Sequence, residues 1–325
     1  MDKELLDKLK DLSKKEITLE KLCNMLGLSN LEVLGLIKEL EKEGLNISKI
    51  AKDDGIHILN KGDVNEFKDN HYKFGTDEYN EFKFAVISDT RLGSTSQQLS
   101  ILNDIYKKAN ELGIKHVFHC GNISEGLYPL TSEYAPTLFV SDTIMQANYI
   151  VQNYPFVEGI KTYFLLGTKD ITHLKKKQID IGKIISESRE DMIYLGIDRC
   201  NIEIDKVKLD LRNVKGKKTY TVSYRAQKII DALRSEDIPD IMIYGGLLQM
   251  ESFKYRGVRL ISSPSVVATT NEMFNNENNN TVGNWFITIV TNKKGELVKV
   301  IPTAATYYST DKLDYQKSKV LRGEQ

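Results

Sequence analysis

The sequence predicts an α/β protein: a layered β-sandwich with flanking helices, preceded by a small, mostly helical domain. Two patterns support this fold class. From Lys83 onward, short apolar strands alternate with amphipathic helices, whereas residues 1–60 show helical spacing that ends in a hairpin pattern. The length of 325 residues and the hydrophobic content of 41% suit more than one folding unit with a substantial core.

Composition argues against several classes of protein. The formal net charge is zero, so the chain as a whole has no attraction for nucleic acid or an anionic membrane. No apolar run is long enough for a membrane span, and the charged amino terminus has no signal-peptide core. We therefore expect a cytoplasmic protein with no membrane partner. Three widely spaced cysteines, Cys23, Cys120 and Cys200, are expected to be buried free thiols.

Residues 1–60 are expected to form three helices and a hairpin. After a first, highly charged helix, Thr18 is the expected N-cap of a second helix that stops at Gly27, and Asn30 that of a third that stops at Gly44. Two short strands follow, over 46–51 and 55–59. This order resembles a winged helix-turn-helix.

The main domain is expected over 83–308, after a linker or covering strand at 61–82 and before a polar tail at 309–325 that is either disordered or a short docking helix. Loops at the carboxyl ends of its strands are where sites of this fold class lie. The expected strands are 83–88, 115–120, 161–166, 192–195, 202–205, 207–212, 240–244, 258–263, 283–291 and 296–303, and the expected helices lie near 96–112, 140–152, 178–188 and 222–234.

The first expected strand carries the most informative motif of the chain. It ends in Ser88-Asp-Thr-Arg-Leu-Gly-Ser94, which resembles the first motif of the calcineurin-like metallophosphoesterases. In that family the position of Arg91 is a histidine that binds metal together with the aspartate. A guanidinium stays protonated and cannot ligate a cation.

The same kind of replacement recurs downstream. The second motif reads Gly121-Asn-Ile-Ser-Glu-Gly126, with Asn122 at the place of the bridging aspartate. The third reads Gly167-Thr-Lys-Asp170, in which Thr168 replaces a ligand asparagine and Lys169 the histidine that protonates the leaving group. The segment 209–214 puts Arg212 at a ligand histidine, and Gly246 and Leu248 stand where the last two histidines would be.

The resemblance covers 83–303 and is similar to bacterial and phage versions of the family, some of which carry an N-terminal winged helix. It implies a calcineurin-like fold with a degenerate metal site, in which only Asp89 remains a charged ligand. One carboxylate cannot hold two dications, so we expect no metal, no cofactor and no catalytic residue. His116 and His119 cannot obviously rescue the site, and His173 is the only candidate for a single metal. The degenerate positions are Asp89, Arg91, Asn122, Thr168, Lys169, Asp170, Arg212, Gly246 and Leu248.

The cationic side chains at the expected ligand positions allow two interpretations. If Arg91, Lys169 and Arg212 converge, they form an anion pocket for phosphate or a nucleic-acid backbone. The nearby lysines Lys175, Lys176 and Lys177 would then contact further phosphates of that backbone. The simpler alternative, which we favour, is that Arg91 and Lys169 pair with Asp89 and Asp170 and close the site.

Residues 1–60 could contact either DNA or a protein. They hold ten Lys against twelve Asp plus Glu, and the expected recognition helix carries Glu32, Glu39, Glu41 and Glu43. Because phosphate contacts dominate DNA affinity, such a helix is a poor groove binder. Contact with a protein is at least as good an interpretation.

The leading functional hypothesis is a catalytically inactive pseudo-phosphoesterase. It would act as a binding or regulatory subunit with a protein partner, beside nucleic-acid or phage-related machinery. One alternative is a DNA-binding regulator that uses the winged helix. Another is a residual phosphodiesterase or nuclease with a single metal at Asp89, Asn122 and His173.

Overall fold

The computed structural model describes residues 3–13, 17–42, 45–52, 55–63, 71–129, 131–132, 135–215, 221, 223–270, 273 and 280–317. These fall into two compact units, Met1–Lys68 and Asp69–Gln325. In the described ranges, no helix has both the length and the apolar character that a membrane crossing needs.

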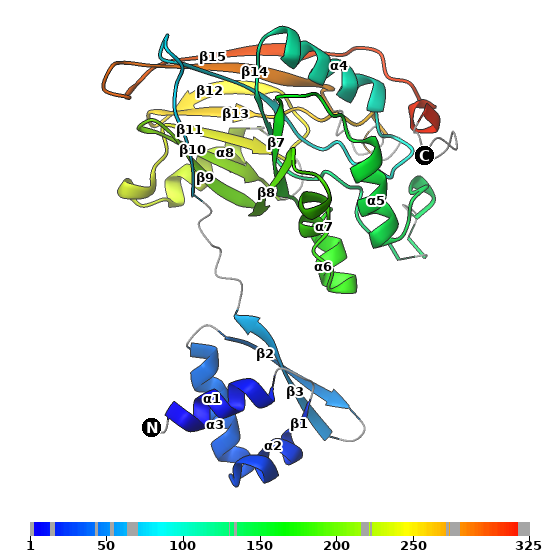
Figure 1. The fold of residues 1–325 in the computed structure, drawn as a ribbon, viewed down its shortest axis with the longest axis vertical. Helices are drawn as coiled ribbons and strands as arrows, with labels where there is room; N and C mark the ends of the chain where they lie inside the picture. Colours follow the sequence, from blue (N-terminus) through cyan, green and yellow to red (C-terminus); the bar gives the residue numbers. More distant parts are fainter. Residues whose placement is uncertain are drawn as a thin grey trace. The chain divides into compact units, whose positions relative to one another are not determined.

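The described part of the first unit contains three helices and a three-stranded sheet. Its helices are α1 (Lys3–Leu12), α2 (Leu19–Leu26) and α3 (Asn30–Lys42), and its strands β1 (Ile17–Thr18), β2 (Leu45–Lys52) and β3 (Gly55–Asp63) pair in the order β1-β3-β2. Figure 1 shows these helices beside the β2–β3 hairpin. Thr18 caps α2 and Gly27 ends it in the left-handed conformation, as expected. Its core includes Leu22, Ile37 and Ile58.

The start of α3 differs from the prediction. Ser29, not Asn30, caps this helix, because the Glu32 carboxylate accepts from the Ser29 amide at 2.8 Å while the Glu32 amide donates to the Ser29 hydroxyl. This reciprocal pair is a capping box. The Asn30 side chain instead accepts a hydrogen bond from the Cys23 thiol. The expected stop at Gly44 lies outside the described residues.

The second unit is built on two facing six-stranded sheets. One has the order β15-β14-β5-β6-β7-β8, and the other has the order β12-β13-β11-β10-β9-β4. The strands are β4 (His71–Phe74), β5 (Glu81–Ile87), β6 (His116–His119), β7 (Lys161–Leu166), β8 (Met192–Ile197), β9 (Arg199–Ile204), β10 (Val207–Asn213), β11 (Ile241–Gly245), β12 (Glu251–Tyr255), β13 (Val258–Ser262), β14 (Gly283–Thr291) and β15 (Leu297–Thr306).

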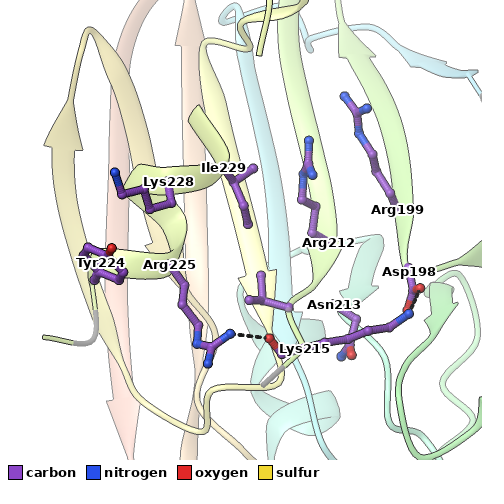
Figure 2. A pocket seen from close by; sticks show the side chains of 10 residues that line it. Asp198, Arg199, Arg212, Asn213, Lys215, Tyr224, Arg225, Lys228 and Ile229 are labelled. Atoms are coloured by element: carbon purple, nitrogen blue, oxygen red, sulfur yellow. Dashed lines mark hydrogen bonds and ion pairs between the residues drawn. The ribbon is translucent and has the colours of Figure 1, made fainter. Parts of the chain in front are cut away.

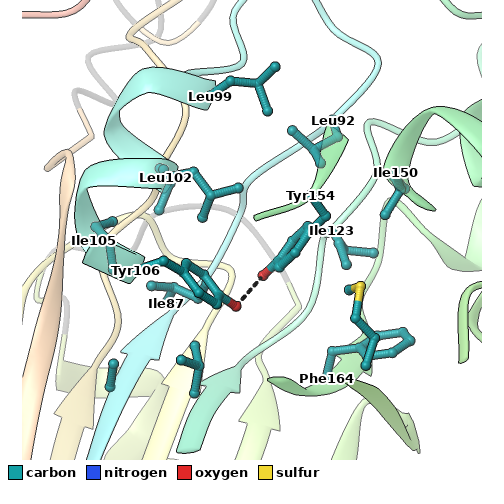
Figure 3. Packing of buried hydrophobic residues seen from close by; sticks show 14 of the residues in the cluster. Ile87, Leu92, Leu99, Leu102, Ile105, Tyr106, Ile123, Ile150, Tyr154 and Phe164 are labelled. Atoms are coloured by element: carbon teal, nitrogen blue, oxygen red, sulfur yellow. Dashed lines mark hydrogen bonds between the residues drawn. The ribbon is translucent and has the colours of Figure 1, made fainter. Parts of the chain in front are cut away.

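Helices cover the outer faces of both sheets (Figure 1). The buried residues of α4 (Leu99–Glu111), α5 (Thr143–Asn153) and α7 (Ile181–Ser188) pack on the first sheet, and those of α8 (Ser223–Ala232) pack on the second. In Figure 3, Leu102 and Tyr106 of α4 pack near Ile87 of β5, and Tyr106 donates to the Tyr154 hydroxyl at 3.3 Å. A further apolar layer, including Phe84, Leu209 and Ile243, fills the space between the sheets.

The predicted α/β sandwich with flanking helices is therefore confirmed. In the second unit, helix α6 (Ile171–Lys177) and strand β12 were not predicted. Strand β4 pairs with β9 and lies within 61–82, so of the two alternatives for that segment the described part shows a strand. The three cysteines are buried and free, as expected.

The start of the polar tail docks on the second unit. A 3-10 helix, η3 (Asp314–Lys317), places the buried Asp314 so that the Ser100 amide donates to its carboxylate at 3.1 Å. Of the two alternatives for the tail, the described part therefore shows docking.

Candidate functional site

The candidate site lies where the loops after β5, β6, β7, β10 and β11 meet at the carboxyl ends of the strands. Hydrogen bonds join these loops directly. The Asp89 amide donates to the Gly121 carbonyl at 3.0 Å, and the Thr168 amide donates to the Asn213 side chain at 3.2 Å. The close fit depends on glycine: a Cβ on Gly167 would lie 2.4 Å from the Asn122 amide oxygen.

Several residues of these loops have a backbone conformation that L-residues rarely adopt. Asp89 has a φ of 50°, Arg91 of 45°, Asn122 of 60° and Leu248 of 61°. Left-handed conformations cost residues with a Cβ roughly 1–2 kcal/mol each. Asp and Asn tolerate this conformation, so the strain in these loops falls mainly on Arg91 and Leu248.

Asp89 lies at the centre, with a fully buried side chain. Its Oδ1 accepts from the Arg91 guanidinium, through Nε and Nη2 at 3.2 Å each, and from Asn122 Nδ2 at 2.9 Å. Its Oδ2 accepts from the Ser88 hydroxyl at 2.8 Å and from the Gly246 amide at 3.1 Å. Both carboxylate oxygens are therefore occupied by protein donors.

Arg91 occupies the predicted position of a metal-binding histidine, and 11% of its side chain is exposed. Burial acts to lower the pKa of its guanidinium, but the nearby Glu125 and Asp89 outweigh burial and raise it above the ordinary value. The side chain is thus a permanent cation held against Asp89. It neutralises the charge of the buried Asp89 carboxylate.

Asn122 connects two loops through its amide. Its Nδ2 donates to Asp89, and its Oδ1 accepts from the Lys169 amide at 2.9 Å. The oxygen that would ligate a metal is therefore already a hydrogen-bond acceptor.

Lys169 does not pair with Asp170, contrary to the prediction. Its ammonium lies 2.9 Å from the Glu125 carboxylate and also contacts the Tyr128 hydroxyl. Tyr128 in turn donates to the same Glu125 oxygen at 2.5 Å. Glu125 is the partner that sequence reasoning missed, although it lies in the second motif.

Asp170 has a structural role instead. Its buried carboxylate accepts from the Gly167 and Ser124 amides at 2.8 Å each, from the Ile123 amide at 3.2 Å and from the Ser124 hydroxyl at 2.7 Å. Burial raises its pKa to about 6, although these four donors act to lower it. Asp170 thus ties the loop after β7 to the loop after β6.

Arg212 pairs with Asp210 and lines another pocket, so the alternative in which Arg91, Lys169 and Arg212 converge does not hold for this residue. The side chains of strand β10 point alternately to the two faces of its sheet. Leu209 and Leu211 pack between the sheets, whereas Arg212 lies on the opposite face and pairs with Asp210 at 2.7 Å. The residue of β10 that reaches the site is the buried Asn213, whose Nδ2 donates to the Cys120 carbonyl at 2.8 Å.

The other predicted positions contribute little chemistry to the site. Gly246 supplies only its amide, and Leu248 is buried against Val267 and Met273. Lys175, Lys176 and Lys177 occupy the last turn of α6, where Lys176 donates to the Leu127 carbonyl.

Two histidines near the site are buried and neutral. His119 accepts from the Gly121 amide through Nδ1 and contacts the Thr90 hydroxyl through Nε2 at 3.0 Å, and burial lowers its pKa to about 3. His173 contacts the Ser124 and Thr143 hydroxyls, and burial lowers its pKa to about 4. Both ring nitrogens of His173 are thus engaged, which disfavours it as a metal ligand.

The donor set does not fit the two dications that the motif resemblance implies. A metal at Asp89 would have to displace the Asn122, Ser88 and Gly246 donors, and it would lie beside the Arg91 guanidinium. Within the described ranges, no three His, Cys, Asp or Glu side chains gather into a cluster that could hold a metal ion. The arrangement is that of an internally neutralised polar cluster.

No protein-family model matches this chain, and no curated protein matches it. Solved structures do resemble it. A novel archaeal phosphodiesterase is 14% identical, covers 68% of this chain and 100% of its own, and has a TM-score of 0.37. Zinc-bound Vps29 from Entamoeba histolytica is 14% identical over 69% of this chain and 99% of its own, with a TM-score of 0.36. YfcE, a phosphoesterase from E. coli, is 12% identical, covers 68% of this chain and 98% of its own, and has a TM-score of 0.35. Likenesses this distant carry no argument about function.

Proposed function

We propose that this protein is a catalytically inactive protein of the phosphoesterase type that serves as a binding or regulatory subunit. One observation carries the proposal: both oxygens of the Asp89 carboxylate accept hydrogen bonds from Arg91, Asn122, Ser88 and Gly246. The only charged ligand that the motif resemblance preserves is therefore used for internal structure.

The second ion pair of the site supports the same proposal. Lys169 stands where the resemblance implies a proton-donating histidine, but its ammonium is held by Glu125, whose side chain is only 6% exposed. Both cations of the site thus have carboxylate partners. A loop cluster that is neutralised in this way is suited to a structural or binding role.

A phosphodiesterase assay tests this proposal. We expect the purified protein with added Mn²⁺ to hydrolyse bis(p-nitrophenyl) phosphate no faster than buffer containing Mn²⁺ alone. A rate above that background that disappears in Asp89→Ala, and not in the exposed control Lys293→Ala, would establish a metal-dependent enzyme and overturn the proposal.

We propose that the first unit is a winged helix that contacts a protein. The helix pair α2 and α3 followed by the β2–β3 hairpin supports the first part. For the second part, Leu31 near the start of α3 is 85% exposed beside the exposed Glu32. An exposed apolar side chain next to a carboxylate suits a protein surface better than a phosphate backbone.

A further inference from the structure

A cationic pocket lies on the outer face of the second sheet, beside α8, and Asn213 at its edge also reaches the Asp89 site. It is an open pocket of about 480 Å³. Figure 2 shows Arg199 and Arg212 on neighbouring strands, with Arg225 and Lys228 on α8. The fifth cation, Lys215, follows β10.

The strand register places two of these cations directly opposite each other. Arg199 of β9 pairs across the strands with Arg212 of β10. Like charges in that position repel, and one carboxylate offsets them: Asp210 lies 3.1 Å from Arg199 and 2.7 Å from Arg212. Because Asp210 carries a single charge, this group keeps a formal excess of one positive charge.

The rest of the pocket adds to this excess. Lys215 pairs with Asp198, and Arg225 donates to the Lys215 carbonyl at 2.8 Å. Lys228 lies 5.7 Å from the centre of the Tyr224 ring. The five cations and the two carboxylates named here carry a formal excess of three positive charges.

One donor of the pocket is unused. Arg199 Nε is buried and has no hydrogen-bond partner within the described part of the chain. A buried donor without a partner has a free-energy cost of about 1–3 kcal/mol. Because Nε itself is buried, an anion would meet the rest of the Arg199 side chain, which is 32% exposed.

We propose that this pocket binds a single-stranded nucleic acid through successive phosphates of its backbone. The cations come from β9, β10, the segment after β10 and α8, and they are spread around the pocket, so they suit several phosphates better than one. Tyr224 is 49% exposed, and its ring offers a face for base stacking. This pocket shares Asn213 with the Asp89 site, but its cations are different residues and the proposal does not depend on the loss of catalysis there.

Fluorescence anisotropy with a labelled oligothymidine tests the proposal on the full chain. We expect Arg225→Gln/Lys228→Gln to bind more weakly than the unchanged protein. The slope of log affinity against log salt should fall by about 1.4, because each lost phosphate contact to a single strand removes roughly 0.7. The control is Lys293→Gln/Lys294→Gln, which removes the same charge from the exposed turn after β14 and should leave affinity and slope unchanged.

Competition and footprinting complete the test. Inorganic phosphate should compete only at far higher concentration than unlabelled oligothymidine, and the bound strand should protect Lys215 and Lys228, but not Lys293 and Lys294, from acetylation of the unchanged protein. Equal competition by phosphate would identify a small-anion site and overturn the proposal. Tighter binding of a duplex of the same length, no binding at low salt, or equal weakening in both double variants would also overturn it.

Discussion

Arg91 and Asp89 form a buried ion pair in which Nε and Nη2 of the guanidinium both lie 3.2 Å from the same carboxylate oxygen, Oδ1. The other oxygen, Oδ2, is left for the Ser88 hydroxyl and the Gly246 amide. The two residues lie two positions apart in one loop, so the same short segment supplies both the buried carboxylate and its counter-charge. Three predictions concern this pair and other buried residues of the candidate site, and a fourth concerns the first unit.

The first prediction concerns the strength of the pair. Arg91→Ala should lower the free energy of unfolding by about 3–5 kcal/mol, because it leaves the buried Asp89 charge uncompensated. The matched control is Lys83→Ala, which breaks a surface pair with Glu81 at 3.0 Å and should cost at most about 1 kcal/mol. Chemical denaturation at pH 7.5 measures both. Equal costs for the two variants would mean that Arg91 does not neutralise Asp89.

The second prediction restores a carboxylate at the site. Asn122→Asp replaces the Nδ2 donor, now 2.9 Å from Asp89, with a second negative charge. Two adjacent carboxylates raise one pKa of the pair, so the native state keeps a proton and loses stability as the pH rises. We expect a cost of about 1–3 kcal/mol at pH 8 and a smaller one at pH 5. Asn103→Asp on the exposed surface of α4 is the control, and a cost that does not grow with pH would contradict the expectation.

The third prediction concerns the loss of stability of the fold at acidic pH. His119 and His173 are neutral in the fold because burial lowers their pKa values to about 3 and about 4. Below pH 6.5 the unfolded chain binds protons that the native state does not, so stability falls as the pH falls. Between pH 7.5 and 5.5 each histidine should cost about 1.4 kcal/mol. Asp170 acts in the opposite direction, because burial raises its pKa to about 6 and the native state gains a proton there.

Denaturation at the two pH values checks this expectation. His119→Gln should be less stable at pH 7.5 but should lose about 1.4 kcal/mol less than the unchanged protein between the two values. The control is His71→Gln, at an exposed position of β4. An unchanged pH dependence in His119→Gln would contradict a neutral, buried His119.

The fourth prediction concerns the first unit. Residues 1–60 hold fewer Lys than Asp plus Glu, so they should add little non-specific DNA affinity. Binding of the full chain to DNA should therefore survive in a fragment of residues 69–325, which form a compact unit of their own. Salt titrations of both proteins measure this. Loss of binding in the fragment, with a steep salt dependence in the full chain, would mean that the first unit contacts DNA.

The sequence was sufficient to predict the sandwich and the loop that carries Asp89, because buried strands and their terminal motifs are local patterns. It was not sufficient to predict the partner of Lys169. Asp170 is adjacent in the chain, but backbone amides occupy it, and Glu125 comes from another loop. Only the fold brings that carboxylate to the lysine.

The position of Arg212 was predictable in principle. Leu209 and Leu211 are apolar and lie on the buried face, so a period of two places Asn213, not Arg212, at the site. The cationic pocket had no such signal, because its side chains come from residues 199–228 and only the register of β9 and β10, together with the packing of α8, brings them together.

The metal content of the purified protein tests the central claim most directly. After dialysis against Mn²⁺ and removal of free metal, the metal-to-protein ratio should be close to zero, because the Asp89 oxygens are held by Arg91, Asn122, Ser88 and Gly246. A ratio near one or two that falls to zero in Asp89→Ala would show that metal displaces these donors, and it would contradict the account.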